Sequence, residues 1–262
     1  MEKNIKVLII PDVHGREFWR EPVKDVLENT DAKIVFLGDY LDCYPYEFEY
    51  GIDYKEKSIA NFNEIINLKK ENKNRIILLL GNHDGSYRFD IEICDCRTDY
   101  KNYERISNIF NENKELFDIA YETYINDKHI IFSHAGISKQ YAEYVFGEEV
   151  NENNVVDLFN NAYHTEDYDL IKTLGIYDRY RGSYGRRDFA SLIWTDVRTW
   201  IDNEDKEYGY GYNVFGHTQL DKDCGGIIRD KFSDIDCQEV FYINENGELK
   251  EFFEKKEEKI DE

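Results

Sequence analysis

The sequence has few cysteines and no long apolar run, and each absence excludes a class of protein. Five cysteines in 262 residues are an odd number without zinc-site spacing, which favours a reducing compartment over a disulfide-stabilised secreted domain. We expect Cys94 and Cys96 to be ordinary thiols, because a C-x-C pair alone is weak support for a metal site. The apolar stretch before Pro11 is too short for a signal sequence or a membrane span. We therefore expect a cytoplasmic protein without membrane partners.

Basic residues are also scarce. The chain has 33 Lys and Arg against 55 Asp and Glu, which gives a formal net charge of −22 at pH 7. This balance disfavours nucleic acid as a partner, because phosphate backbones are bound by clustered Lys and Arg. An anionic substrate needs local positive charge, which divalent metal ions can supply. With 41% hydrophobic residues the chain can form a full core. We expect a single domain over residues 1–253, followed by a charged tail at 254–262.

Short apolar runs alternate with helix-compatible segments in the first half of the chain, which predicts βαβ units and an α/β fold. Residues 58–73 have apolar side chains at helical spacing behind Ser58, a candidate N-cap. Two strand-like runs flank a turn at 244–247, which indicates an antiparallel hairpin in a mixed or second sheet. Two stretches without strand signal, 85–118 and 138–190, are predicted to be largely helical insertions. The apolar runs of strand type are 6–12, 33–39, 75–82, 129–136 and 212–218.

Each of these five runs has Asp, His or Asn at or near its C-terminal end. Within one sheet, the five ends would converge on one edge. Carboxylate, imidazole and amide groups are ligands that suit Mn, Fe or Zn. Six ligands are enough for two divalent metal ions that share one carboxylate, an arrangement used for displacement at phosphorus. The six candidates are Asp12, His14, Asp39, Asn82, His134 and His217.

Each candidate also has a structural interpretation. His134 or His217 alone would more often be a hydrogen-bonded structural histidine, and Asp42 could cap the turn that follows it. Chance does not explain why all five runs have such residues at or near their ends, so the set as a whole favours a metal site. His129 and His164 lie at no strand end, and we expect them to be structural.

The same five elements, in this order, make the chain resemble the calcineurin-like metallophosphoesterases. The resemblance covers residues 9 to about 220, and is strongest to the branch of the serine/threonine protein phosphatases and the bacterial symmetrical dinucleoside tetraphosphatases. It implies a four-layer αββα sandwich of two mixed β-sheets flanked by helices. By this resemblance Asp12, His14 and Asp39 would bind a first metal ion. Asn82, His134 and His217 would bind a second, which shares Asp39. The matching motifs are PDVHG, GDYLD, GNHD, SHAG and FGHT, with Trp194-Thr195-Asp196 similar to the W-S-D element of that branch.

Three positions depart from parts of the family pattern. Gln219 stands where the wider superfamily has the final His of G-H-x-H, a departure that the protein phosphatases share. Asp84 replaces their Glu, as it does in the tetraphosphatases. Cys43 stands where the protein phosphatases have an Arg that binds the substrate phosphate. A thiol can neither carry a positive charge nor donate two parallel hydrogen bonds. The candidates for a replacement cation are Arg198, ranked first for its place after W-T-D, Arg88 and Arg181, although each could instead pair with an acidic residue.

The resemblance implies direct hydrolysis of a phosphomonoester, as in the serine/threonine phosphatases, by a hydroxide that bridges two metal ions. His83 is the expected general acid, and Asp42 is expected to orient its ring. One alternative is a nucleotide-type hydrolase such as a dinucleoside tetraphosphatase, whose bases could stack on tyrosines of the second insertion. Another is a scaffold without catalytic activity, against which the intact ligand set argues. The tyrosines are Tyr163, Tyr168, Tyr177, Tyr180 and Tyr184.

Overall fold

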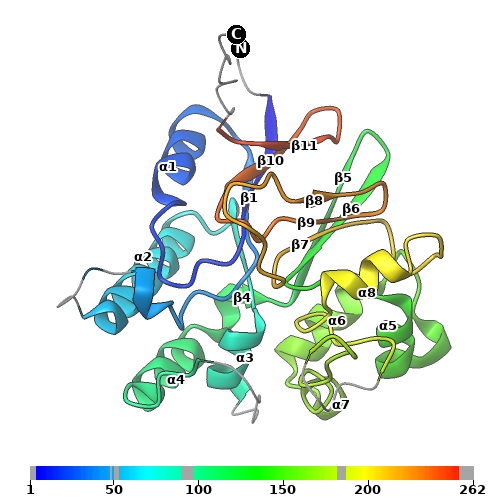
Figure 1. The fold of residues 1–262 in the computed structure, drawn as a ribbon, viewed down its shortest axis with the longest axis horizontal. Helices are drawn as coiled ribbons and strands as arrows, with labels where there is room; N and C mark the ends of the chain where they lie inside the picture. Colours follow the sequence, from blue (N-terminus) through cyan, green and yellow to red (C-terminus); the bar gives the residue numbers. More distant parts are fainter. Residues whose placement is uncertain (1–3, 48, 50–52, 90–96, 182–186, 254–262) are drawn as a thin grey trace, which may run out of the picture.

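The computed structural model describes residues 4–47, 49, 53–89, 97–181 and 187–253. Cys94, Cys96, Tyr184 and the predicted tail at 254–262 lie outside these residues. Within them, two β-sheets pack together with helices on both outer faces (Figure 1). This arrangement confirms the predicted four-layer sandwich of two mixed sheets.

The first sheet contains, in spatial order, β11 (Leu249–Glu251), β10 (Phe241–Asn244), β1 (Ile5–Ile10), β2 (Lys33–Phe36), β3 (Ile76–Leu79) and β4 (Phe117–Asp118). Neighbouring strands from β1 to β4 are parallel, while β10 and β11 add an antiparallel hairpin at one side. The prediction of a hairpin around the turn at 244–247 is therefore confirmed.

The second sheet contains β5 (Ala120–Ile125), β6 (Lys128–Ser133), β7 (Tyr212–Phe215), β9 (Phe232–Asp234) and β8 (Ile227–Ile228). The strands β6, β7 and β9 are parallel, and β5 and β8 run antiparallel to their neighbours. The edge strand β5 was not predicted, because its half-buried polar residues give no apolar run.

Alternation along β1 explains how the first sheet is covered on both faces. Val7 and Ile9 lie in a buried cluster with Phe132 of the second sheet, whereas Leu8 and Ile10 lie in the cluster that includes the helices. On the outer face of the second sheet, the ring of Trp200 packs 5.2 Å from that of Phe215. Each sheet is thus buried on both sides.

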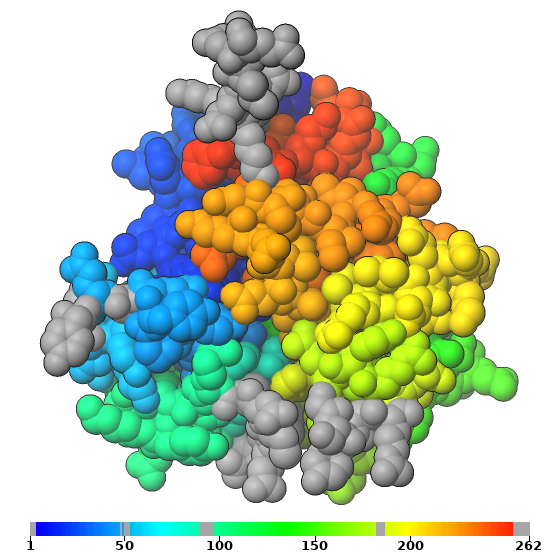
Figure 2. Space-filling view, in the orientation of Figure 1, coloured from blue at the N-terminus to red at the C-terminus, as the bar shows by residue number. Residues whose placement is uncertain are grey.

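The helices are α1 (Arg20–Asn29), α2 (Tyr54–Glu71), α3 (Asn82–Phe89), α4 (Tyr103–Glu112), α5 (Lys139–Phe146), α6 (Val155–His164), α7 (Tyr168–Ile171) and α8 (Val197–Asp202). The expectation that Ser58 caps a helix is wrong, because α2 begins one turn earlier and Asp53 accepts the capping hydrogen bond from Glu56 N. Helices α3 to α7 occupy much of the two stretches predicted to be helical. No helix in the described residues is long and apolar enough to cross a membrane. Figure 2 shows the molecule from the same side as Figure 1, with the N-terminal segments on the left and the α5 to α8 region on the right.

Candidate metal centre

The polar ends of β1, β2, β3, β6 and β7 meet at one place, but they come from two sheets. Ile10, Phe36 and Leu78 are neighbours in the first sheet. In the second sheet Phe132 pairs with Val214. The five ends therefore do not share the edge of one sheet: the edges of two sheets meet at the site.

The backbone of the converging turns is adapted to this close approach. A Cβ atom on Gly81 would lie 2.1 Å from Asp39 Oδ1, so only glycine fits there. A Cβ atom on Gly216 would likewise lie 2.2 Å from Asp12 Oδ1. Several non-glycine residues also have the left-handed backbone conformation, whose cost is tolerated mainly at functional sites. They are His14 (φ 44°), Asp39 (φ 53°), Asp42 (φ 57°) and His217 (φ 72°).

One carboxylate oxygen lies at the middle of the cluster. Asp39 Oδ2 is 3.5 Å from His14 Nε2 and 3.6 Å from His134 Nε2. Asp12 Oδ2 lies 3.9 Å from His14 Nε2, on the side of β1. Asp39 is therefore placed between two groups of ligand atoms, as a bridging carboxylate must be.

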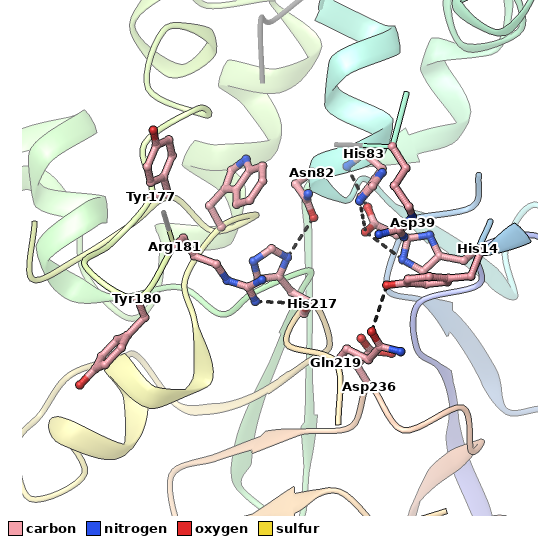
Figure 3. A pocket seen from close by; sticks show the side chains of 13 residues that line it. His14, Asp39, Asn82, His83, Tyr177, Tyr180, Arg181, His217, Gln219 and Asp236 are labelled. Atoms are coloured by element: carbon pink, nitrogen blue, oxygen red, sulfur yellow. Dashed lines mark hydrogen bonds and ion pairs between the residues drawn. The ribbon is translucent and has the colours of Figure 1, made fainter. Parts of the chain in front are cut away.

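The second group contains two imidazoles and an amide. Asn82 Oδ1 lies 2.9 Å from His217 Nδ1 (Figure 3). It also lies 2.9 Å from His134 Nε2, and the two ring nitrogens are 3.2 Å apart. All three residues are at least nine-tenths buried. The six predicted ligands thus lie together.

Two backbone carbonyls determine which ring nitrogen faces the cluster. Nδ1 of His14 donates to Leu41 O at 2.7 Å, and Nδ1 of His134 donates to Leu37 O at 2.9 Å. In a neutral imidazole with this tautomer, Nε2 has only a lone pair. The lone pair of His134 then faces the amide oxygen of Asn82, which is also an acceptor. Such converging acceptors suit a cation, and a second ring nitrogen that donates to a carbonyl is typical of metal-binding histidines.

Burial determines the electrostatics of the site. It lowers the pKa of His14 and of His217 well below the usual value, which favours the neutral form that binds metal. Burial also raises the pKa of Asp39 well above its usual range, although His83 opposes this effect. Metal ions would offset the cost of these buried carboxylates.

His83 belongs to a hydrogen-bonded chain beside the ligands. Its Nδ1 lies 2.7 Å from Asp42 Oδ2, and its Nε2 lies 4.0 Å from Asp39 Oδ2. The hydroxyl of Tyr87 donates to Asp42 Oδ1 at 2.5 Å and accepts from Asp99 N at 2.6 Å. Sequence reasoning paired His83 with Asp42 but missed Tyr87, which α3 places one turn after His83.

Asp84 ties two of the turns together. Its Oδ2 accepts from Asp39 N at 2.7 Å and from Gly81 N at 2.9 Å, and its Oδ1 accepts from Tyr40 N at 3.1 Å. Burial raises the pKa of Asp84 to about 7, although these N–H donors lower it. The residue is fully buried and does not line the cavity, so its place is structural.

A cavity of about 290 Å³ opens above the ligands. Of the insertion tyrosines, Tyr177 and Tyr180 line it, whereas Tyr163 is buried in the core and Tyr168 is exposed on the surface. The cavity is lined by His14, Asp39, Tyr44, Asn82, His83, Arg97, Tyr177, Tyr180, Arg181, Trp194, His217, Gln219 and Asp236 (Figure 3).

Only one of the three predicted substrate-binding arginines lines this cavity. Arg181 does so, and its Nη2 donates to Thr218 Oγ1 at 3.1 Å. Arg198 instead donates from Nε to Asp196 Oδ1 at 2.8 Å. Arg88 is buried and donates from Nη2 to Glu166 Oε1 at 2.6 Å. Arg198 and Arg88 were predicted to bind the substrate phosphate, but neither lines the cavity. Each is paired with an acidic residue outside the cavity lining.

Arg97 also lines the cavity, although it was not among the arginines predicted from the sequence. Its Nε donates to Asp42 O at 3.1 Å, and its guanidinium lies 3.6 Å from the centroid of the Tyr44 ring. It therefore packs against the turn that contains Cys43. No local pattern marks this contact, because 55 positions separate Arg97 from Asp42.

His129 and His164 lie apart from the cluster, among acidic residues. His129 Nε2 is 2.7 Å from Glu122 Oε2, and His164 Nε2 is 2.8 Å from Asp118 Oδ1. These contacts agree with the structural interpretation of both histidines.

The calcineurin-like phosphoesterase family model matches residues 5–223 of the chain. A cold-active protein-tyrosine phosphatase of a psychrophilic Shewanella species is structurally similar, with a TM-score of 0.53 and 16% sequence identity over 95% of this chain and 80% of that one. A protein serine/threonine phosphatase from Saccharomyces cerevisiae has a TM-score of 0.50 and 16% identity over 97% of this chain and 82% of that one. These likenesses show the fold alone. No curated protein matches the sequence.

A two-sheet sandwich whose strand ends gather buried Asp, His and Asn residues defines a metallophosphoesterase. The chain belongs to the calcineurin-like phosphoesterase family and is a hydrolase of phosphoric esters. The family depends on two metal ions, and within the described residues two groups of buried side chains are close enough together to hold metal. They are Asp12, Asp39 and His134, and His14, Asp39 and His83.

Proposed function

We propose that this enzyme is a phosphomonoesterase of the serine/threonine phosphatase type. The observation that carries the proposal is the position of Asp39 Oδ2, 3.5 Å from His14 Nε2 and 3.6 Å from His134 Nε2. Asp12, His14 and Asp39 would hold a first ion of Mn, Fe or Zn. Asn82, His134 and His217, with Asp39 shared, would hold a second. Bound ions supply Lewis acidity to the phosphoryl oxygens and lower the pKa of water.

His83 would give a proton to the leaving oxygen. The carboxylate of Asp42 holds Nδ1, so the proton available for transfer is on Nε2, which faces the ligand cluster. Tyr87 donates to the other oxygen of Asp42 and keeps this carboxylate in place. The proton donor is thus fixed relative to the shared carboxylate of Asp39.

Arg97 and Arg181 would bind the oxygens of the substrate phosphate. Both line the cavity, and they belong to different loops of an otherwise acidic chain. A guanidinium can donate two parallel hydrogen bonds to phosphate, which a thiol at position 43 cannot. Arg97 would replace the cation missing at Cys43.

The cavity favours a small substrate group over a dinucleotide. Its volume of about 290 Å³ lies just below the usual range for ligand pockets. The alternative is a nucleotide-type hydrolase such as a dinucleoside tetraphosphatase. One observation favours it: Tyr44, Tyr177, Tyr180 and Trp194 line the cavity and could stack on a base.

A substrate panel with Mn²⁺ tests the proposal. It contains a phosphoserine peptide, a dinucleoside tetraphosphate, p-nitrophenyl phosphate and its bis-ester. We expect the highest kcat/KM for the monoesters. A preference for the dinucleotide of about 10-fold or more, which is about 1.4 kcal/mol of transition-state binding, would support the alternative instead. If no substrate is hydrolysed and no metal is bound, the chain is a scaffold.

A further inference from the structure

Asp236 is a buried carboxylate to which the proposed centre assigns no role. It is only 4% exposed and lines the cavity. Its backbone carbonyl accepts a hydrogen bond from Leu220 N at 2.8 Å, so the residue lies next to Gln219 (Figure 3). Sequence reasoning missed it because Asp236 follows β9 in a segment without a family motif.

The side chain of Asp236 has no direct partner in the described part of the chain, where its carboxylate makes no hydrogen bond and no ion pair. The two cationic side chains with the largest electrostatic effect on Asp236 are Arg16 and Arg181, and each is paired with another carboxylate. Arg16 donates to the two oxygens of Glu47 at 2.8 and 2.9 Å, and Arg181 Nε lies 3.1 Å from Asp196 Oδ2. Neither cation is free to pair with this carboxylate, so the position suits a cation from outside the chain.

The position of Asp236 relates it to the first ion rather than the second. A Cβ atom on Gly216 would lie 2.2 Å from Asp12 Oδ1 and 3.7 Å from the Cβ atom of Asp236. The side chains of Asp12 and Asp236 therefore both lie beside the same glycine. Asp12 is one of the three residues assigned to the first ion.

Gln219 does not fill this side of the first site. Its Oε1 accepts a hydrogen bond from the hydroxyl of Tyr44 at 3.1 Å, so the amide oxygen is already engaged (Figure 3). The donors left for the first ion are Asp12, His14 and Asp39, which are fewer than Mn or Fe binds in proteins with a full shell of ligands.

We propose that Asp236 is a further residue of the first metal site, where its carboxylate adds negative charge and an oxygen acceptor on the side that Gln219 leaves open. The proposal rests on the two-metal centre proposed above. The competing explanation is structural, with Asp236 serving only to balance the charges of Arg16 and Arg181.

The test is a calorimetric titration of Mn²⁺ into the metal-stripped full chain. Asp236→Asn removes the charge and keeps the shape. Asp118→Asn is the matched control, since it removes a carboxylate that is bonded to His164 away from the cavity. We expect the wild type and the control to bind two ions. Asp236→Asn should bind one ion unchanged and the other at least about 10-fold more weakly, the loss typical for residues that support metal ligands. Thermal unfolding of the stripped variant should occur at no lower temperature than that of the stripped wild type.

Two results would overturn the proposal. One is wild-type affinity of Asp236→Asn for both ions, and the other is a wild type that binds fewer than two ions. If Asp236→Asn does not fold, the same titration is made on Asp236→Ala, which also removes the carboxylate. Wild-type affinity of that variant for both ions would count against the proposal. The proposed function is tested separately: weaker binding of one ion by the variant supports Asp236 even if the wild type hydrolyses no ester in the panel.

Discussion

The carboxylate of Asp42 lies 2.7 Å from Nδ1 of His83, although the two residues are 41 positions apart. Both are buried, and the backbone N–H of His83 donates to Asp39 Oδ1 at 3.0 Å. The turn after β2 therefore contacts both the ring and the backbone of His83. The proposed proton donor is thus held by residues of the same turn that contains Asp39.

Replacing His83 with Asn should remove the general acid and leave the metal ligands in place. For a phosphoserine peptide, whose leaving alkoxide needs a proton, we expect kcat to fall by about 10²–10⁴. The loss should be much smaller for p-nitrophenyl phosphate, because its leaving group departs without protonation. Kinetics on both substrates, with Mn content measured alongside, checks this. An equal loss on both substrates would contradict the role of His83.

Replacing Tyr87 with Phe should remove one of the hydrogen bonds that fix the carboxylate of Asp42. The variant loses the donor to Asp42 and the acceptor for Asp99 N, so we expect the free energy of unfolding to fall by about 1–3 kcal/mol. We also expect a fall in kcat, since the orientation of His83 depends on Asp42. Urea unfolding and steady-state kinetics measure the two effects. Tyr141→Phe is the matched control: its hydroxyl is buried 3.0 Å from Thr173 Oγ1, and only stability should change.

The candidate metal ligands could be predicted from the sequence because each one lies within a few positions of the end of an apolar strand. Asp12 and Asp39, for example, lie two and three positions after the last residues of β1 and β2. The number of sheets could not be read from strand patterns, since a run such as 129–136 looks the same in either sheet. Tyr87, Arg97 and Asp236 were missed for another reason. Their neighbours in space are distant in sequence, and a lone Tyr, Arg or Asp has no pattern that marks its contacts.

Replacing Arg97 with Ala should raise KM for phosphomonoesters more than it lowers Mn affinity. We expect kcat/KM to fall by roughly 10-fold or more, as for the loss of a charge-assisted hydrogen bond of about 1.5–3 kcal/mol. Arg198→Ala is the informative comparison, because Arg198 is bonded to Asp196 and does not line the cavity. If Arg198→Ala loses as much activity as Arg97→Ala, the assignment of the phosphate site to Arg97 is wrong.

Removing metal with a chelator should abolish hydrolysis and lower the unfolding temperature. The proposed ions would offset buried carboxylates such as Asp39, and removal of the ions would leave these carboxylates without a cation in the folded state. At an ion concentration of about 100 times Kd, binding adds about 2.7 kcal/mol to the free energy of unfolding. This corresponds to roughly 5–10 °C for a chain of this length. Scanning calorimetry with and without Mn²⁺ measures the shift, and an unchanged unfolding temperature would argue against a bound centre.

Changing Asp84 should affect stability before it affects specificity. Asp84→Ala leaves the N–H groups of Asp39, Tyr40 and Gly81 without their acceptor, at a cost of about 1–3 kcal/mol for each buried donor. Asp84→Glu adds a methylene at a fully buried position and should cost about 1–3 kcal/mol through overpacking. Urea unfolding checks both variants. If Asp84→Glu folds with wild-type stability and switches the preferred substrate, then Asp84 determines specificity rather than structure.

The pH dependence of stability tests the burial of Asp84 in the metal-free protein. Burial raises the folded pKa to about 7 from an ordinary value of 3.8, so the folded state keeps a proton that the unfolded chain has lost. Between about pH 4 and pH 7 the folded state therefore binds more protons, and the free energy of unfolding falls as pH rises. Asp84→Asn cannot titrate there, so the stability of the wild type relative to this variant should decrease across that window. A difference that instead grows with pH would mean that the N–H donors outweigh burial and that Asp84 is ionised throughout.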